Sequence, residues 1–305
     1  MSILRIFDVS AYIHAGKVNK RAGIDFEPIQ TDRGYVPRWL PTGGVSFLFN
    51  AVNLFHSNSF LVFAFDRNPL MRKSVNPEYK SNRISDPSIV LMQDLAEFAI
   101  QECGFNCCAE DKYEADDVIY TICTKYKSEF SHIYIHSNDS DVFMNVNEKV
   151  SIAPVRSNDK EVNLDNYEMK VNSSRITPYN ECNYYKLLYG DKADNYGGIK
   201  DSSLLNRIIN FSSSTTMQSN LGDSVVYGSY IKSLLPEAYP QFLLAYPQLI
   251  SSDIDIYLEP DWEAINMWGW RVGNSGFTFS NVNKESIKYK RMMDYINNLG
   301  GFIEI

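Results

Sequence analysis

Long apolar runs are scarce in this chain, and the longest clean one spans only about Leu61 to Phe65. A membrane-spanning helix needs roughly 20 apolar residues, and the N-terminus lacks the profile of a signal peptide. We therefore expect a cytoplasmic protein that does not enter a membrane. Its 305 residues suffice for one large domain or two ordinary ones.

Metal-binding thiols and a basic surplus are also missing. The five cysteines form no CxxC pair, and no histidine stands at zinc-ligand spacing, so we expect reduced structural thiols and no zinc site. The net charge of −8 argues at first against nucleic acid as a partner, because phosphate binding normally requires an excess of basic residues. That argument depends on where the acidic residues lie.

Short β-rich apolar runs predict three buried strands, at Leu4 to Phe7, Leu61 to Phe65 and Ile133 to His136. Helical patterns separate them, over Gly44 to Phe55 and Pro87 to Cys103. This alternation predicts an α/β fold with a mostly parallel central sheet over residues 1–180. The pattern over residues 181–305 is helical, with helices expected at Ser203 to Asn210, Ser224 to Leu234 and Lys284 to Asn298.

Each predicted strand runs directly into acidic residues. Asp8 follows the first strand, Asp66 the second, and Asp139 and Asp141 the third. In open parallel sheets the carboxyl ends of the strands form the usual site, so we expect these carboxylates to converge.

A further acidic stretch, "YEADD" at Tyr113 to Asp117, opens a helix expected from Glu114 to about Tyr126. Two like charges about 4 Å apart cost on the order of 4 kcal/mol near a protein surface, so something must compensate for them. A helix cap is the simple alternative, since acidic residues in a first turn complement the helix dipole. The strand-end aspartates favour a metal site instead.

Together with a glycine-bounded turn, these stretches supply nine carboxylates: Asp8, Asp66, Glu114, Asp116, Asp117, Asp139, Asp141, Asp191 and Asp194. Oxygen ligands without His or Cys select Mg²⁺ or Mn²⁺. Nine exceed the needs of one ion, whereas two ions about 3.5–4 Å apart support in-line attack at a phosphodiester. With the nine set aside, the rest of the chain is nearly neutral, and a polyanionic substrate is no longer excluded.

The segment from Arg67 to Arg83 is basic, with five Lys and Arg residues against the single acid Glu78. Basic residues interleaved with an aromatic ring suit single-stranded nucleic acid. The alternative is a solvated surface loop. Its place directly after Asp66 favours the nucleic-acid interpretation.

In their order, these motifs resemble the 5′-nuclease superfamily, which comprises flap endonucleases, the 5′-nuclease domain of bacterial DNA polymerase I, and phage 5′-exonucleases such as the T-even phage ribonuclease H. The matching pieces, over residues 5–195, are "FDVS", "FAFD", "PEYKSNR", "YEADD", "SNDSD" and "GDKADN". The resemblance implies a PIN-like nuclease core with a helical C-terminal region. It also implies a structure-specific 5′ to 3′ nuclease that removes flaps or RNA primers by a two-metal mechanism.

The resemblance also assigns roles to residues. It implies a tighter Mg²⁺ ion on Asp8, Asp66, Glu114, Asp116 and Asp117, and a second ion on Asp139, Asp141, Asp191 and Asp194, with Mn²⁺ able to substitute. Lys80 would lie at the scissile phosphate, Arg83 would clamp a second phosphate, and Tyr79 would stack on a base. The arch over the site would span about residues 67–90. The full set expected to bind nucleic acid is Arg67, Arg72, Lys73, Tyr79, Lys80, Arg83, Lys192, Gly197 and Gly198.

Two stretches depart from the family pattern. After "GDKADN" the chain keeps Gly197 and Gly198 but lacks the second glycine hairpin that grips duplex DNA and a potassium ion. The region after about Ser212, with Trp262, Trp268 and Trp270, matches nothing in the family, and we expect its aromatic residues to form core.

Expected partners are DNA or an RNA–DNA hybrid with a free 5′ end, and a single-strand-binding protein or sliding clamp that docks on the closing "LGGFIEI". We expect a monomer that acts in the cytoplasm of a phage-infected bacterium.

Three other functions compete. A catalytically silent scaffold would bind branched DNA without cleaving it. A PIN-type ribonuclease would not need Asp191 and Asp194. A phosphatase is disfavoured because Asp8 is followed by Val9 and Ser10 rather than by the Asp-x-Asp pairing of a phosphoaspartate mechanism.

Overall fold

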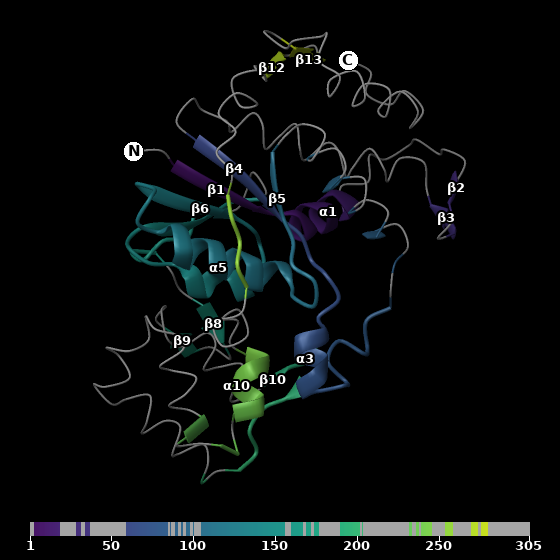
Figure 1. The fold of residues 1–305 in the computed structure, drawn as a ribbon, viewed down its shortest axis with the longest axis vertical. Helices are drawn as coiled ribbons and strands as arrows, with labels where there is room; N and C mark the ends of the chain where they lie inside the picture. Colours follow the sequence, from purple (N-terminus) through teal and green to yellow (C-terminus); the bar gives the residue numbers. More distant parts are fainter. Residues whose placement is uncertain are drawn as a thin grey trace.

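In this computed structural model of the chain, the described residues are 3–18, 29–31, 34–36, 59–84, 105–155, 160–166, 169–171, 174–176, 190–201, 239–245, 254–258, 270–273 and 276–279, with short pieces between 86 and 100 and between 203 and 237. Figure 1 shows their arrangement. Among these residues, no helix is long and apolar enough to cross a membrane.

A five-stranded sheet in the order β5-β4-β1-β6-β7 forms the centre of the fold, and every neighbouring pair is parallel. Its strands are β1 (Ile3–Asp8), β4 (Ser59–Ala64), β5 (Asn106–Cys108), β6 (His132–His136) and β7 (Val150–Ala153). The chain adds β4 and β5 on one side of β1 and then returns to add β6 and β7 on the other. This places a topological switch point between β1 and β6, where open α/β sheets usually bind ligands.

Helix α5 (Ala115–Tyr126) covers one face of this sheet (Figure 1). Its buried residues, among them Val118, Ile119 and Ile122, pack on apolar side chains of all five strands. Burying an aliphatic side chain contributes about 1.5–3 kcal/mol, so this layer fixes α5 over the sheet. The start of α5 therefore lies in a defined place next to the carboxyl ends of the strands.

The remaining elements are shorter. Helices are α1 (Val9–Val18), α3 (Leu70–Val75), the 3₁₀ helix η1 (Ser140–Asn145) and α10 (Tyr239–Ala245), which packs beside α3. Four two-stranded ribbons are β2 (Ile29–Thr31) with β3 (Gly34–Val36), β8 (Met169–Val171) with β9 (Ser174–Ile176), β10 (Gly190–Asp191) with β11 (Tyr196–Gly197), and β12 (Trp270–Gly273) with β13 (Gly276–Phe279).

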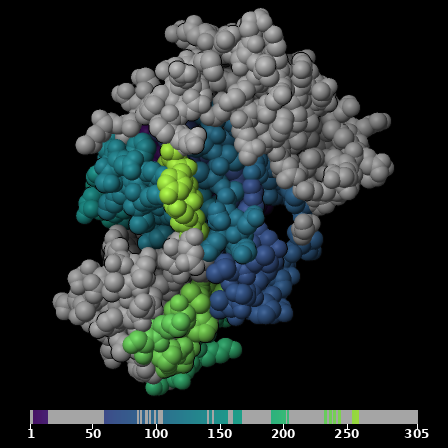
Figure 2. Space-filling view, viewed as in Figure 1, coloured from purple at the N-terminus to yellow at the C-terminus, as the bar shows by residue number. Residues whose placement is uncertain are grey.

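An extended segment, residues 254–258, crosses the outside of α5 and forms the yellow-green strip in Figure 2. Ile254 and Ile256 are buried in the core that α5 shares with the sheet. The Tyr126 hydroxyl donates to the Ile256 carbonyl at 3.0 Å and accepts from the Leu258 amide at 2.9 Å. A segment near the C-terminus thus helps to hold the helix that opens with the "YEADD" motif.

The predicted α/β class with a mostly parallel sheet is confirmed, as are the three predicted strands and the helix that starts at Glu114. The described positions between 89 and 100 are helical, as expected, but the ends of that helix lie outside the described residues. The same holds for the predicted helix over 44–55, most of the three later helices, Trp262, Trp268 and "LGGFIEI". The boundary near residue 180 also falls outside them and stays a prediction.

Candidate active site

Asp8, the last residue of β1, lies at the switch point of the sheet. Its Oδ2 accepts a hydrogen bond from the Ser137 hydroxyl at 2.6 Å, just after β6, and its Oδ1 accepts one from the Ala11 amide at 3.1 Å. Burial, followed by the charge of Asp66, raises the pKa of Asp8 to about 7, although both hydrogen bonds oppose the shift. Asp8 is therefore held in a fixed orientation in a place that penalises its negative charge.

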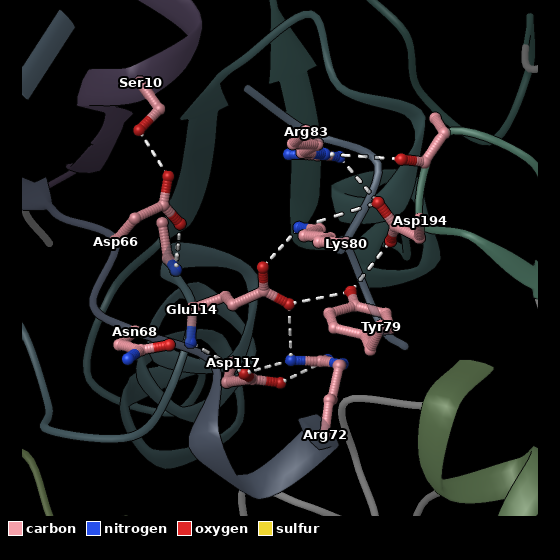
Figure 3. A network of polar contacts seen from close by, with 12 residues as sticks. Ser10, Asp66, Asn68, Arg72, Tyr79, Lys80, Arg83, Glu114, Asp117 and Asp194 are labelled. Atoms are coloured by element: carbon pink, nitrogen blue, oxygen red, sulfur yellow. Dashed lines mark hydrogen bonds and ion pairs between the residues drawn. The ribbon is translucent and has the colours of Figure 1, made fainter. Parts of the chain in front are cut away.

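Asp66 lies shortly after β4, and its side chain contacts the start of α5. Its Oδ1 accepts from the Ala115 amide at 2.8 Å, and its Oδ2 accepts from the Ser10 hydroxyl of α1 (Figure 3). Ser10 in turn accepts from Gln93 Nε2 at 2.9 Å. These contacts orient Asp66 from two helices, and no sequence pattern had indicated Ser10, Gln93 or Ser137 as supporting residues.

Asp116, in the first turn of α5, is affected by the charges of acidic groups from other parts of the chain. Desolvation, followed by the charges of Asp139, Asp141 and Asp8, raises its pKa well above the ordinary value. The sequence predicted that strand-end and helix-start carboxylates converge, and the structure brings these four together. Like charges held this close favour a bound cation.

A second group consists of Asp141, Asp191 and Asp194. One carboxylate oxygen from each lies within 4.8 Å of the others. Asp191 ends β10 and Asp194 lies in the turn that follows, and Asp191 Oδ1 accepts from the Ala193 amide at 2.8 Å. Gly190, the first residue of β10, has φ +72°, and an added Cβ would lie 2.4 Å from the Tyr196 carbonyl oxygen, so only glycine fits.

Arg72 forms ion pairs with two carboxylates of the "YEADD" motif, Glu114 and Asp117. Its side chain is 4% exposed, and its Nη1 donates to Glu114 Oε2 at 2.9 Å. The two terminal guanidinium nitrogens also donate to Asp117, Nη1 to Oδ2 at 2.6 Å and Nη2 to Oδ1 at 2.7 Å. The Glu114 amide donates to the same Asp117 Oδ2 at 3.0 Å, which caps α5. The crowding of charge at this helix start is thus relieved partly by a buried guanidinium.

Lys80 and Arg83 lie against Glu114 and Asp194 (Figure 3). The Lys80 ammonium forms an ion pair with Glu114 and lies 3.6 Å from Asp194 Oδ1, while Arg83 Nη2 donates to that oxygen at 2.6 Å. Burial alone would lower the pKa of Lys80, but Glu114 and Asp194 hold it above its ordinary value. Lys80 and Arg83 thus offset the repulsion between Glu114 and Asp194, and Lys80 stays charged.

The backbone of the basic segment is docked on the turn between β10 and β11. The Lys80 amide donates to the Asp194 carbonyl at 2.9 Å, and Asn195 Nδ2 donates to the Glu78 carbonyl at 2.9 Å. Lys80 has φ 55°, in the left-handed region that costs energy for a non-glycine residue. Such strain is characteristic of functional sites. Of the arch predicted over 67–90, positions 85, 87 and 88 lie outside the described residues.

Three predicted site residues lie in surroundings that differ from those expected for their roles. Arg72 is buried and saturated by carboxylates, so it is not placed to bind nucleic acid. The ring of Tyr79 is 2% exposed and packs at 6.2 Å from the ring of Tyr196, so it does not offer a face to a base. Asp117 is fully buried, and the contacts that the structure shows for its carboxylate are those with Arg72 and the Glu114 amide. Its predicted role as a metal ligand stays a prediction.

The other residues predicted to contact nucleic acid are at least partly exposed. Arg83 has 53% of its side chain exposed, and Lys192 and Gly197 are exposed. Lys73 and Gly198 are half-buried, and Arg67 forms an ion pair with Glu97 at 2.5 Å.

Comparison with known proteins finds similarity to 5′-3′ exonucleases. Residues 22–172 match the family model "5′-3′ exonuclease, N-terminal resolvase-like domain". The chain is 32% identical over 144 residues to a 5′-3′ exonuclease of Mycoplasma pneumoniae, covering 46% of this chain and 48% of that one. It is 30% identical over 174 residues to a 5′-3′ exonuclease of Bacillus subtilis, covering 53% and 55%.

The match spans about half the length of these curated relatives. Among solved structures, the T5 D15 protein co-crystallized with metal ions aligns with a TM-score of 0.48 and 16% identity, over 81% of this chain and 86% of that one.

Proposed function

The chain belongs to the 5′-nuclease superfamily, and on that premise we propose that it is a structure-specific 5′ to 3′ nuclease. It hydrolyses phosphodiester bonds in DNA flaps, nicked duplexes or RNA-primed DNA. One observation carries the proposal: Asp141, Asp191 and Asp194 converge, and the cations Lys80 and Arg83 pair with Asp194 of this group and with Glu114 at the start of α5. Asp116 is affected in addition by the charges of Asp8, Asp139 and Asp141. Carboxylates for metal ions and cations for phosphate are the parts that phosphodiester hydrolysis needs.

Mg²⁺ is the proposed cofactor, with Mn²⁺ as a substitute. The donors fit, because they are all carboxylate oxygens and their mutual repulsion is relieved by a divalent cation. Asp8, Asp66, Glu114 and Asp116 would hold one ion, and Asp139, Asp141, Asp191 and Asp194 the other. Bound Mg²⁺ supplies an activated water at neutral pH and positive charge beside the phosphorus.

The chain's own cations do the rest. Lys80 and Arg83 contact a phosphate that lies at the two carboxylate groups, and they stabilise the negative charge that develops on its oxygens. Ser137 and Ala11 keep Asp8 oriented, while Ser10 and the Ala115 amide keep Asp66 oriented. We place Lys73, Lys192, Gly197 and Gly198 along the path of the nucleic-acid backbone.

We assign the protein to DNA replication, where it removes RNA primers or displaced flaps as a monomer in the cytoplasm of a phage-infected bacterium. A single-strand-binding protein or sliding clamp is the proposed partner. Pull-down with the isolated "LGGFIEI" peptide tests the docking site.

The experiment that tests the activity uses a 5′-labelled flap oligonucleotide with a free or streptavidin-blocked 5′ end. We expect cleavage in Mg²⁺ or Mn²⁺, none in EDTA, and a rate lower by about 10³-fold in Asp139→Asn, because losing one ligand removes several kcal/mol of charge stabilisation. Asp165→Asn is the matched control, since Asp165 is exposed and distant in sequence from both acidic groups. Its rate should equal that of the wild type.

Two outcomes would overturn the proposal. Tight flap binding without cleavage would make the protein a scaffold for branched DNA. Faster cleavage of single-stranded RNA than of flap DNA, in direct competition, would make it a PIN-type ribonuclease.

A further inference from the structure

Tyr79 has a buried ring and a hydroxyl group that points into the site (Figure 3). The ring packs with Tyr196 of β11 and Leu244 of α10, and Val75 of α3 lies against the same small cluster. Segments far apart in the sequence therefore fix the ring. A ring held on several sides cannot turn outward to stack on a base without breaking this cluster.

The hydroxyl lies between two carboxylates that belong to different parts of the fold. It is 2.9 Å from Glu114 Oε2 and 2.8 Å from Asp194 Oδ2. Glu114 precedes the first turn of α5, whereas Asp194 lies in the turn between β10 and β11. Both carboxylates are 5% exposed, so water does little to screen their repulsion.

One hydroxyl has one proton, so Tyr79 donates to one carboxylate at a time or shares its proton between both in a three-centre hydrogen bond. The two carboxylates can stay this close only if cations offset their repulsion. The structure provides those cations. Arg72 donates to Glu114, Lys80 pairs with Glu114 and approaches Asp194, and Arg83 donates to Asp194. With Asp117 included, three guanidinium or ammonium groups face three carboxylates. Tyr79 is the neutral link at the centre of this balanced set.

We propose that Tyr79 is a positioning residue, whose hydroxyl ties Glu114 to Asp194 and so sets the separation of the two proposed cation sites. The inference rests on the proposed function, because Glu114 belongs to one carboxylate group and Asp194 to the other. Tyr79 itself touches neither a base nor the reacting phosphate. This role differs from the stacking role that its sequence motif predicts.

The test is Tyr79→Phe, which keeps the ring and removes only the hydroxyl. We expect kcat on the flap substrate to fall by about 10- to 100-fold, the usual effect of losing a group that orients metal ligands, while KM stays within twofold. The affinity for Mn²⁺, measured by calorimetry without DNA, should fall by about tenfold or more. In metal-free protein, amide hydrogen exchange in residues 191–195 should become faster.

Tyr126→Phe is the matched control, because it removes a second buried tyrosine hydroxyl on the far end of α5. It should leave kcat, Mn²⁺ affinity and exchange at 191–195 unchanged. A stacking role predicts the opposite pattern for Tyr79: a normal Tyr79→Phe enzyme, and weaker flap binding for Tyr79→Leu measured in EDTA. That pattern would overturn the proposal.

Failure of the nuclease assignment is separable from failure of this inference. If the wild type does not cleave DNA, Mn²⁺ affinity and hydrogen exchange still compare Tyr79→Phe with Tyr126→Phe. Equal exchange at residues 191–195 in these two variants and the wild type would contradict the bridging role, whatever the enzyme does to DNA.

Discussion

Replacement of Asp116 with asparagine is expected to reduce phosphodiester cleavage by about 10³-fold or more and to stabilise the metal-free protein at the same time. The carboxyl group lies among Asp8, Asp139, Asp141 and Glu114, and desolvation and their charges raise its pKa. Asparagine keeps the shape but removes the charge. Removing a charge that desolvation and like-charged neighbours both penalise should therefore raise the free energy of unfolding of the metal-free protein.

Urea denaturation in EDTA at pH 7, together with the flap assay in Mg²⁺, measures both effects. The exposed Asp165→Asn controls for the change in net charge and should alter neither value. A variant of Asp116 that is both inactive and less stable would show that the carboxylate supports the fold, as a helix-start residue, and would count against a cation site.

Replacement of Arg72 with methionine is expected to lower the free energy of unfolding by about 3–5 kcal/mol, the usual cost of leaving one partner of a buried ion pair. Arg72 is 4% exposed and makes three hydrogen bonds to Glu114 and Asp117. Arg72→Lys should recover little, because an ammonium cannot bind both oxygens of Asp117 as the planar guanidinium does.

A double-mutant cycle isolates this ion pair. In Arg72→Met with Asp117→Asn, the charge of Asp117 is gone, its amide oxygen still accepts from the Glu114 backbone, and Glu114 keeps Lys80 as a partner. The double variant should therefore be more stable than the sum of the single losses predicts. Lys73→Met removes the same charge from the same helix α3 and should change stability by less than about 0.5 kcal/mol. Purely additive effects would refute the coupling.

The convergence of the strand-end aspartates was predictable because parallel strands end at one edge of the sheet. Asp8 and Asp66 follow strongly apolar runs, so local sequence alone located them. Strands β5 and β7 were missed because Asn106–Cys108 and Val150–Ala153 are short and carry little alternation. Each of these two strands forms by pairing with a longer strand of the sheet, β5 with β4 and β7 with β6.

The groups that offset the charge repulsion within "YEADD" were predicted only in part. Repulsion among its three carboxylates required cations, and the sequence favoured metal ions for all of them. In the structure Arg72 instead binds Asp117 and one oxygen of Glu114, which leaves Asp116 facing the strand-end aspartates. Arg72 lies more than 40 positions away from its partners, and no local pattern reports such a pairing.

The burial of Tyr79 was not predictable for the same reason. Its burial depends on Tyr196 and Leu244, which lie in other parts of the chain. In the sequence it stands among basic residues, which are typical of an exposed nucleic-acid segment. One feature of the sequence could have indicated the burial of Tyr79. Tyr79 directly precedes Lys80, and the backbone at Lys80 must be held in place if its side chain is to reach the carboxylates.

The measurement that tests the central claim most directly is calorimetric titration of the wild type and Asp191→Asn with Mn²⁺ at pH 7.5. If the two carboxylate groups are separate cation sites, the wild type should bind two ions per chain and Asp191→Asn should lose one of them. No saturable binding to the wild type, or identical binding to both proteins, would contradict the assignment of these carboxylates to divalent cations.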